Sequence, residues 1–272
     1  VKGGEGDRCI CLRADIDALP IQEENTVDYR SQRNGVMHAC GHDAHTSMVL
    51  TAGRVLHALR EQWSGTVLLL FQPGEEKIPG GASLVVKEDA LRDPRPQAIL
   101  GQHVTPELAV GKVGFREGPF MASSDELYVT VKGKGGHAAM PHLHIDPILM
   151  TARLLLQLKE EFAVLHPGHA KVLSFGKVIA NGATNVIPNE VRIEGTLRAF
   201  DERVREQLHV WLQERSQALC AAHGATCDFE VRRGYPVVVN NPELTRRIRA
   251  AAEAFLGKDH VVDMDQRMGS ED

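Results

Sequence analysis

Short apolar runs alternate with helix-like patterns along the first part of the chain. Residues 9–14 form an apolar run that ends at a turn containing Asp and Pro, which predicts a buried strand. Between residues 43 and 63, apolar side chains recur as they do on one face of a helix. These side chains are Met48, Leu50, Ala52, Val55, Leu56 and Leu59. Further strands are expected over residues 66–71 and 98–103, with a helix over residues 82–91 between them. This alternation is typical of an α/β fold with a doubly wound, mostly parallel sheet.

The pattern changes after about residue 115. Apolar and polar residues alternate in the next strand, as they do in a sheet with one exposed face. The expected strands cover residues 126–132, 172–179, 190–200 and 227–232, and the expected helices cover residues 148–162 and 201–223. Asp146 with Pro147 supplies a cap and first turn for the first helix. The order β-α-β-β-α-β indicates a ferredoxin-like α+β unit.

A helical pattern returns at residues 242–256, beyond this unit. The simplest organisation is a small domain inserted into a larger one. We therefore expect residues 1–114 to form the first part of the larger domain and residues 115–233 to form the insertion. Residues 234–272 would return to the larger domain.

Composition excludes several classes of protein. Of the 272 residues, 43% are hydrophobic and 25% charged, as in globular proteins. The net charge is −5 and Lys and Arg form no long run, so nucleic acid is not an expected partner. No apolar stretch or signal-peptide pattern indicates a membrane partner or export. The five cysteines are odd in number and unevenly placed, which favours a reducing compartment such as the cytoplasm.

A first cluster of metal-ligand side chains lies at residues 37–45. Cys40 and His42 flank a glycine that permits a tight turn, so that thiolate and imidazole can converge on one ion. Asp43 is expected to orient His42, as carboxylates often do for metal-bound histidines. The plainer reading is a capped helix start with a buried cysteine.

Two more clusters follow the next two strands. Glu75 and Glu76 come directly after an apolar strand, so that one carboxylate can bind metal while the other carries a proton. Read alone, the pair is more often an exposed acidic turn than a catalytic pair. His103 ends the following strand. Because the carboxyl ends of parallel strands meet at one edge, the three clusters predict a site for Zn²⁺, Mn²⁺ or Co²⁺.

Six further patterns follow one another along the chain, namely LRADIDALP, MHACGHDAH, FQPGEE with GGA, GQHV, GKGGHAAMP and NVIPNEVRIEGTLRAF. Together and in this order, these motifs resemble the amidohydrolase family of aminoacylases, hippurate hydrolases and auxin-conjugate hydrolases. This branch belongs to the di-metal, co-catalytic metallopeptidase superfamily, which also includes carboxypeptidases and dipeptidases. The resemblance implies metal-dependent hydrolysis of N-acyl amino acids or similar small amides, with two divalent ions.

The resemblance also implies a role for each matched residue. Cys40, His42, Glu76 and His103 correspond to metal ligands, and many relatives carry a bridging aspartate in place of this cysteine. Glu75 corresponds to the general base, which takes a proton from the attacking water and then protonates the leaving amine.

In such enzymes the inserted domain is a lid through which two chains dimerise, so a homodimer is expected. His137 would reach the partner's active site and polarise the scissile carbonyl. Asn185 and Arg198 match lid positions that contact substrate, with Arg198 as a carboxylate clamp. Taken alone, the three have plainer readings as a surface imidazole, a turn residue and a solvated charge.

Other polar residues flank these motifs. Relatives often place a ligand His near Asp15, but this sequence has none there, so Asp15 and Asp17 are interpreted as supporting the ligands by hydrogen bonds. His38 and His45 are interpreted as structural residues.

The chain begins with Val1 and stops at Gly269-Ser270-Glu271-Asp272, which indicates a piece of a longer protein. The family supplies a further metal-ligating His after this motif, and His260, which precedes it, does not replace that ligand. The 272 residues alone are therefore expected to bind metal poorly and to have little or no hydrolytic activity.

Three other functions stay open. A dipeptidase or carboxypeptidase would use the same machinery, a thiol hydrolase would use Cys40 as nucleophile, and a dimerising relative would have no activity. The intact Glu75–Glu76 pair argues against the last of these. Its negative charge also favours metal over thiol chemistry, because nearby carboxylates raise a thiol's pKa.

Overall fold

The computed structural model describes all 272 residues and divides them into two compact units. Unit 1 comprises Val1–Lys112 together with Asp272, and unit 2 comprises Val113–Glu271. Both units combine helices and strands, so the predicted mixed α/β class is confirmed. None of the helices has both the length and the apolar composition that crossing a bilayer requires. The insertion at residues 115–233 stays a prediction.

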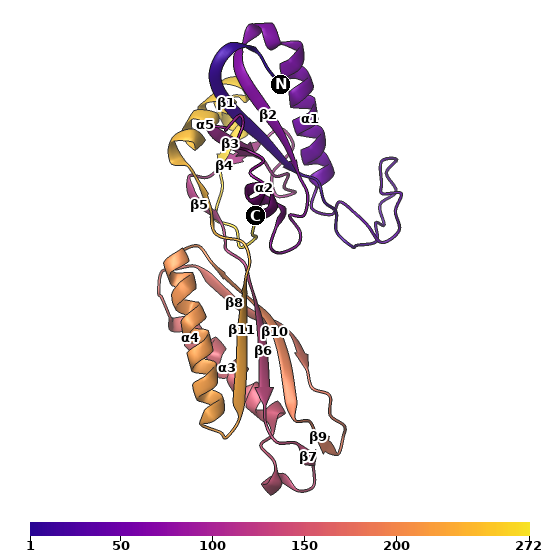
Figure 1. Ribbon diagram of the computed structural model, residues 1–272, viewed down its shortest axis with the longest axis vertical. Coiled ribbons are helices and arrows are strands. Elements are labelled where there is room, and N and C mark those ends of the chain that lie inside the picture. The colour runs from indigo at the N-terminus through magenta and orange to yellow at the C-terminus, as the bar shows by residue number, and fades with distance from the viewer. The chain divides into compact units, whose positions relative to one another are not determined.

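Unit 1 is built on a parallel sheet of three strands (Figure 1). The strands are β1 (Gly4–Asp15), β2 (Ser64–Gln72) and β3 (Ala98–Gly101). The α-helices are α1 (His42–Ala58) and α2 (Gly81–Lys87), and η1 (Arg60–Gln62) is a short 3₁₀ helix. The strands pair in the order β2-β1-β3, with both pairings parallel. Their carboxyl ends therefore meet at one edge, where ligands bind in open α/β sheets. A doubly wound sheet stays a prediction.

Helix α1 buries a different face from the one predicted. Its buried residues are His42, His45, Val49 and Gly53, whereas Leu50, Val55 and Leu59 are exposed. A Cβ atom at Gly53 would lie 2.3 Å from Leu69 Cδ1, so the helix approaches β2 closely at this glycine. The apolar prediction missed this face because a glycine and two histidines form most of it.

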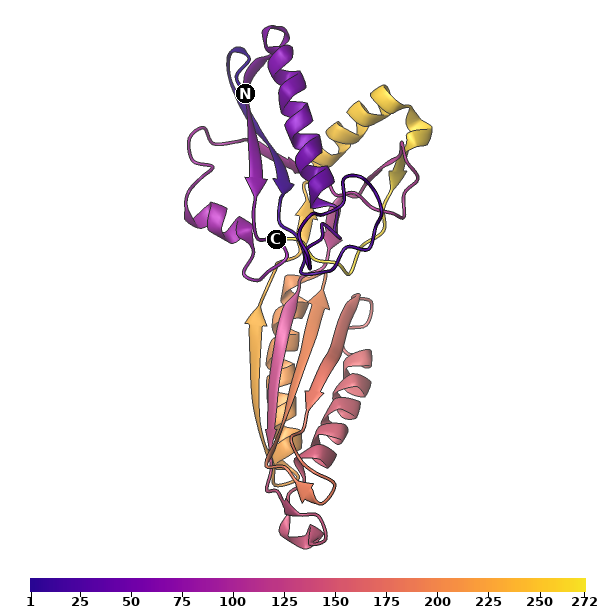
Figure 2. The same ribbon diagram turned by 90° about the vertical axis from the view of Figure 1, so that its right-hand side faces the viewer.

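Unit 2 contains an antiparallel sheet of four strands in the order β11-β6-β10-β8. The strands are β6 (Asp125–Lys132), β8 (Lys171–Ile179), β10 (Glu190–Ala199) and β11 (Thr226–Arg233), and the helices are α3 (Pro147–Val164) and α4 (Glu202–Ala221). Alternate residues of β6 are buried, and this face shares one apolar core with both helices (Figure 2). The predicted element order is confirmed, as is the Asp146 cap, which accepts a hydrogen bond from Ile148 N at 2.8 Å.

A buried carboxylate ties α4 to this sheet. Asp125 is fully buried and accepts hydrogen bonds from Arg205 Nε at 2.9 Å and His209 Nε2 at 2.6 Å. Burial alone would raise the pKa of Asp125, but the hydrogen bonds from Arg205 and His209 outweigh it and hold the pKa at about 2.

The remaining elements of unit 2 are six short strands, two short 3₁₀ helices (η2 and η3) and the longer helix α5. They are β4 (Val113–Phe115), β5 (Gly118–Met121), β7 (Gly136–His137), η2 (Pro141–Leu143), β9 (Val186–Ile187), β12 (Val238–Asn240), α5 (Pro242–Leu256), η3 (Lys258–His260) and β13 (Val261–Asp263). The six strands among them form three two-stranded sheets, β12-β5, β13-β4 and β7-β9. The bounds of α5 match the helix predicted from the sequence.

Candidate metal centre

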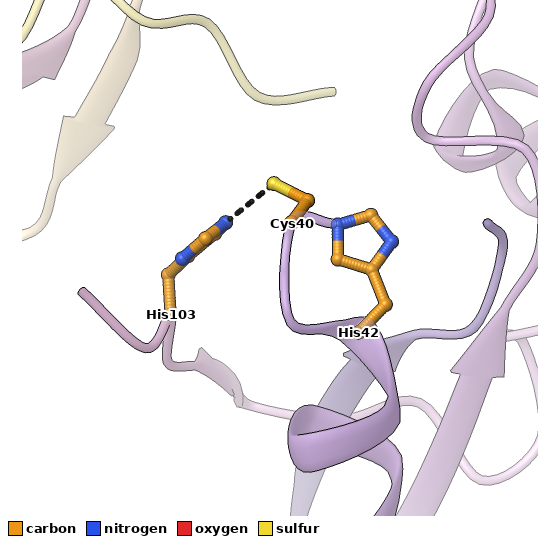
Figure 3. A group of neighbouring side chains, drawn as sticks. All are labelled: Cys40, His42 and His103. Carbon is orange, nitrogen blue, oxygen red and sulfur yellow. Dashed lines mark hydrogen bonds between the residues drawn. The ribbon is translucent and has the colours of Figure 1, made fainter. Parts of the chain in front are cut away.

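The predicted ligand residues of unit 1 come from three loops at the carboxyl edge of its sheet. Cys40 precedes α1, His42 is the first residue of that helix, and His103 follows β3. Cys40 Sγ lies 3.3 Å from His103 Nε2, with the His42 ring beside them (Figure 3). Gly41 between the first two has a φ of 88°, and a Cβ there would lie 2.4 Å from Val104 Cγ2. Glycine is therefore required both for the turn and for the close approach of the third loop.

The imidazole of His42 presents an unpartnered nitrogen to this cluster. Its Nδ1 donates a hydrogen bond to the carbonyl oxygen of Asp17 at 3.0 Å. The Nε2 atom is buried without a hydrogen-bond partner. Buried polar atoms are nearly always paired, so an orphaned nitrogen calls for an explanation. With the proton on Nδ1, the Nε2 lone pair is available to a metal ion.

Carboxylates surround that nitrogen. His42 Nε2 lies 3.8 Å from Glu76 Oε1, 4.0 Å from Glu75 Oε2 and 3.6 Å from Asp15 Oδ2. Two groups of potential ligand atoms share His42, one with Cys40 and His103 and the other with Glu75 and Glu76, and the atoms of each group lie within 4.8 Å of one another. The structure thus brings all five predicted residues together, and this mixture of sulfur, nitrogen and oxygen donors fits a divalent transition metal.

The two adjacent glutamates differ in their surroundings. Glu75 is buried and Glu76 is exposed. The backbone N–H of Glu76 donates to Asp17 Oδ2 at 2.9 Å, so Asp17 holds this loop as well as the ring of His42. Asp43 is exposed, and its carboxylate accepts a hydrogen bond from Ala44 N at 2.9 Å. The carboxylate that lies against His42 Nδ1 is that of Asp17, at 3.3 Å.

Cys40 and His103 form a neutral pair. Burial, together with the charges of Glu76 and Glu75, raises the pKa of the Cys40 thiol to about 12. Burial also lowers the pKa of His103. Both shifts disfavour a thiolate–imidazolium pair, which a cysteine nucleophile would need.

Two side chains that border the centre were given no part in it by the sequence pattern, which assigned His45 a structural role and Arg13 none. His45 Nδ1 lies 2.5 Å from Asp15 Oδ1, and Arg13 Nη1 donates to Asp15 Oδ2 at 3.0 Å. Burial would raise the pKa of Asp15, but these two partners outweigh it and hold the pKa below its usual value. The three-residue spacing of His42 and His45 on α1 is the signal that would have found the second histidine, since it places both rings on one helix face.

The residues predicted to contact substrate lie in unit 2. His137 on β7 is exposed, and the following residue, Ala138, donates its N–H to the carbonyl oxygen of Asn185 at 2.9 Å. His137 and Asn185 are therefore neighbours across the β7–β9 pair. Arg198 lies at the far end of β10, where its Nη1 donates to the carbonyl oxygen of Met268 at 2.8 Å. Within unit 2, the structure brings the first two together and leaves Arg198 apart from them.

The chain is similar to known hydrolases over most of its length. The family model described as peptidase family M20/M25/M40 matches residues 11–272. The chain is 40% identical to an N-acyl-L-amino acid amidohydrolase of Geobacillus stearothermophilus, over 89% of this chain and 65% of that protein. It is also 40% identical to the IAA-amino acid hydrolase ILR1-like 4 of Arabidopsis thaliana, over 97% of this chain and 60% of that protein. The chain thus spans somewhat under two thirds of the length of these relatives.

A solved structure is similar over the whole chain. It is that of a dinuclear metal-binding peptidase of the M20 family from Bacillus subtilis, with a TM-score of 0.83 and 35% sequence identity. The similarity covers 100% of this chain and 69% of that protein.

Proposed function

Because the chain belongs to the M20/M25/M40 peptidase family, we propose that its protein hydrolyses the amide bond of N-acyl amino acids or similar small amides. The observation that carries the proposal is the buried, unpartnered Nε2 of His42 amid Cys40, Glu75, Glu76 and Asp15. The names of the similar hydrolases from Geobacillus and Arabidopsis support amides of amino acids as the substrate class.

Two divalent ions are part of the proposal. Cys40, His42, Glu76 and His103 would hold them, since Cys40 and His103 form one group of close donor atoms with His42, and Glu76 belongs to a second group that shares His42. The ions would polarise the amide carbonyl and make water a stronger nucleophile at neutral pH. The donor set suits Zn²⁺, Mn²⁺ and Co²⁺.

Glu75 is proposed to move the proton. Its carboxylate is buried beside His42 Nε2, whereas Glu76 is more exposed. As water adds to the carbonyl carbon, the Glu75 carboxylate accepts one of its protons. When the C–N bond breaks, the same carboxyl group returns that proton to the nitrogen, which leaves as an amine. The products are a carboxylate and a free amino acid.

The residues of unit 2 complete the proposal. Residues 115–233 would form the ferredoxin-like lid and the dimer contact, inserted into a doubly wound catalytic domain. The exposure of His137 supports a role beyond its own unit, in which its ring polarises the scissile carbonyl in the partner's site. Asn185 would contact substrate beside it. Arg198 would bind a substrate carboxylate, for which its bond to Met268 O would have to open.

A cytoplasmic location belongs to the same proposal. Its support is the set of five free cysteines, of which four are buried.

The test uses the intact protein and a panel of hippurate, N-acetyl amino acids and dipeptides. Chelation should abolish hydrolysis, and addition of Mn²⁺, Co²⁺ or Zn²⁺ should restore it. Preference for dipeptides over N-acyl amino acids would move the function to the peptidase alternative. Activity that survives chelation and is lost on alkylation of Cys40 would refute the metal mechanism in favour of a thiol hydrolase.

A further inference from the structure

His45 uses both of its ring nitrogens inside unit 1. The side chain is 1% exposed, and its Nδ1 lies 2.5 Å from Asp15 Oδ1. Its Nε2 accepts a hydrogen bond from the backbone N–H of Val104 at 2.9 Å. An accepting Nε2 carries no proton, so the proton sits on Nδ1 and is donated to Asp15. The two bonds therefore define a single tautomer.

The peptide groups of Val104 connect His45 to the ligand His103. The N–H of Val104 is held by His45, and its carbonyl oxygen lies 2.6 Å from His103 Nδ1. His103 thus donates through Nδ1 and turns Nε2 towards Cys40. The rings of His45 and His103 also meet edge to face, with centroids 4.5 Å apart. The orientation of His103 depends on where His45 holds Val104.

The anchor of His45 is itself held. Arg13 bridges Asp15 and Asp272, through Nη1 at 3.0 Å and Nη2 at 2.9 Å. Asp272 also accepts hydrogen bonds from Gln72 Nε2 at 2.7 Å and Ala82 N at 2.8 Å. Asp15 is therefore held by Arg13, which Asp272 and Gln72 fix in turn, and His45 cannot move away without losing its contact with Asp15.

We propose that His45 is a positioning residue of the metal centre, which fixes Val104 so that His103 Nε2 faces Cys40. The inference rests on the proposed function for the presence of metal, but not for the hydrogen bonds. A competing reading makes His45 a ligand, because its ring lies within 4.8 Å of donor atoms of Asp15 and His42. That reading requires one of the two hydrogen bonds of the ring to break, whereas the positioning role uses both.

Two substitutions separate the two bonds. In His45→Gln the amide oxygen can replace Nε2 and accept from Val104 N. In His45→Asn the amide nitrogen can replace Nδ1 and donate to Asp15, while the bond to Val104 is lost. His57→Gln, an exposed histidine of the same helix, is the control. Each intact variant is titrated with Co²⁺, whose visible absorption reports ligand geometry, and its affinity is measured against a chelator.

His45→Asn should bind Co²⁺ about 10- to 100-fold more weakly with an altered spectrum, while His45→Gln stays near wild type. Equal losses in both variants, or a lower Co²⁺ stoichiometry in both, would make His45 a ligand and overturn the proposal. Wild-type Co²⁺ affinity in His45→Asn would also overturn the proposal, because the bond to Val104 would then have no effect on the centre. If wild-type protein binds Co²⁺ but cleaves no amide, the proposed function fails and the positioning role stands. If wild-type protein binds no Co²⁺, both fail.

A measurement on wild-type protein covers the case in which a variant does not fold. Nitrogen NMR of the Co²⁺-free protein and of its Zn²⁺ complex should show His45 with a protonated Nδ1 and an unprotonated Nε2 coupled to the Val104 amide. A proton on Nε2, or direct coordination of His45 by Zn²⁺, would contradict the proposal.

Discussion

Cys40 Sγ and His103 Nε2 lie 3.3 Å apart although 63 residues separate them in the chain. The parallel pairing of β1 with β3 brings the loop after β3 to the edge where α1 begins. The raised pKa of Cys40 and the lowered pKa of His103 keep the pair neutral. A neutral pair of this kind is consistent with the proposed coordination, in which a metal ion would displace the thiol proton.

The adjacent glutamates should respond differently to the same substitution. Glu75→Gln should lower kcat by about 10²- to 10⁴-fold with little change in metal affinity, because it removes a proton carrier. Glu76→Gln should instead weaken metal binding. Both are measured by steady-state kinetics and metal titration, with the exposed Glu61→Gln as control. Unchanged hydrolysis in Glu75→Gln would contradict the proposed mechanism.

The Cys40 thiol should resist alkylation in chelator-treated protein. With a pKa of about 12, its thiolate fraction at pH 8 is about 10⁻⁴, against roughly 0.2 for an ordinary thiol. Reaction with iodoacetamide should therefore be about 10³-fold slower than that of a free cysteine peptide, and should accelerate as pH rises. Mass spectrometry of the Cys40 peptide measures the rate, and labelling as fast as the free peptide would show that the thiol is activated.

Gly41→Ala should disturb the centre more than its backbone strain alone predicts. Both Gly41 and Gly35 have positive φ, at 88° and 71°. An alanine at Gly41 would meet Val104 Cγ2 at 2.4 Å, whereas nothing lies within 4 Å of a Cβ at Gly35. Gly35→Ala should cost about 1 kcal/mol from φ alone, and Gly41→Ala a further 1–3 kcal/mol with weaker Co²⁺ binding. Urea unfolding and Co²⁺ titration compare them, and equal effects would show that the contact with Val104 is unimportant.

The buried Asp125 should make unit 2 sensitive to acid. Its pKa falls from an ordinary 3.8 to about 2 on folding, so it stabilises the fold at pH values above about 4. This contribution, about 2 kcal/mol, is lost as pH falls from about 4 to 2, because the proton then binds the unfolded chain more readily.

Asp125→Asn tests this contribution at neutral pH. The variant should lose about 3 kcal/mol because it leaves Arg205 and His209 without their buried anion. Asp228→Asn breaks an exposed pair with Lys132 and should change little. Unfolding in urea at pH 7 and pH 2.5 measures the stability of both variants. If the two variants were equally stable at pH 7, the Asp125 carboxylate would not stabilise the fold.

The convergence of the proposed metal donors was predictable because it depends on strand order. Each proposed donor lies in a loop after a strand or at the start of the helix that such a loop leads into, and parallel pairing brings these loops to one edge of the sheet. The supporting contacts were less predictable. Asp43 is next in sequence to His42, but its carboxylate accepts a hydrogen bond from Ala44 N. The ring of His42 instead contacts Asp17, which lies 25 residues earlier in the chain. The bond from Val104 to His45 depends on the path of the chain after β3, which hydrophobic periodicity does not encode.

The buried face of α1 shows the same limit. Periodicity selected leucines and valines, but the tight approach to Leu69 at Gly53 and the polar network of His45 decided which side faces the sheet. In unit 2, by contrast, regular alternation in β6 and the Asp146 cap specified the elements locally, and the predicted boundaries lie within two residues of those observed.

The position of Asp272 in the chain has a consequence for biosynthesis. The five residues proposed for the centre, Cys40, His42, Glu75, Glu76 and His103, all lie within the first 103 residues of the sequence. The carboxylate that holds Arg13 emerges 259 residues after its partner. During synthesis, the hydrogen bonds that hold Arg13 against both Asp15 and Asp272 can therefore form only after all five of these residues have left the ribosome.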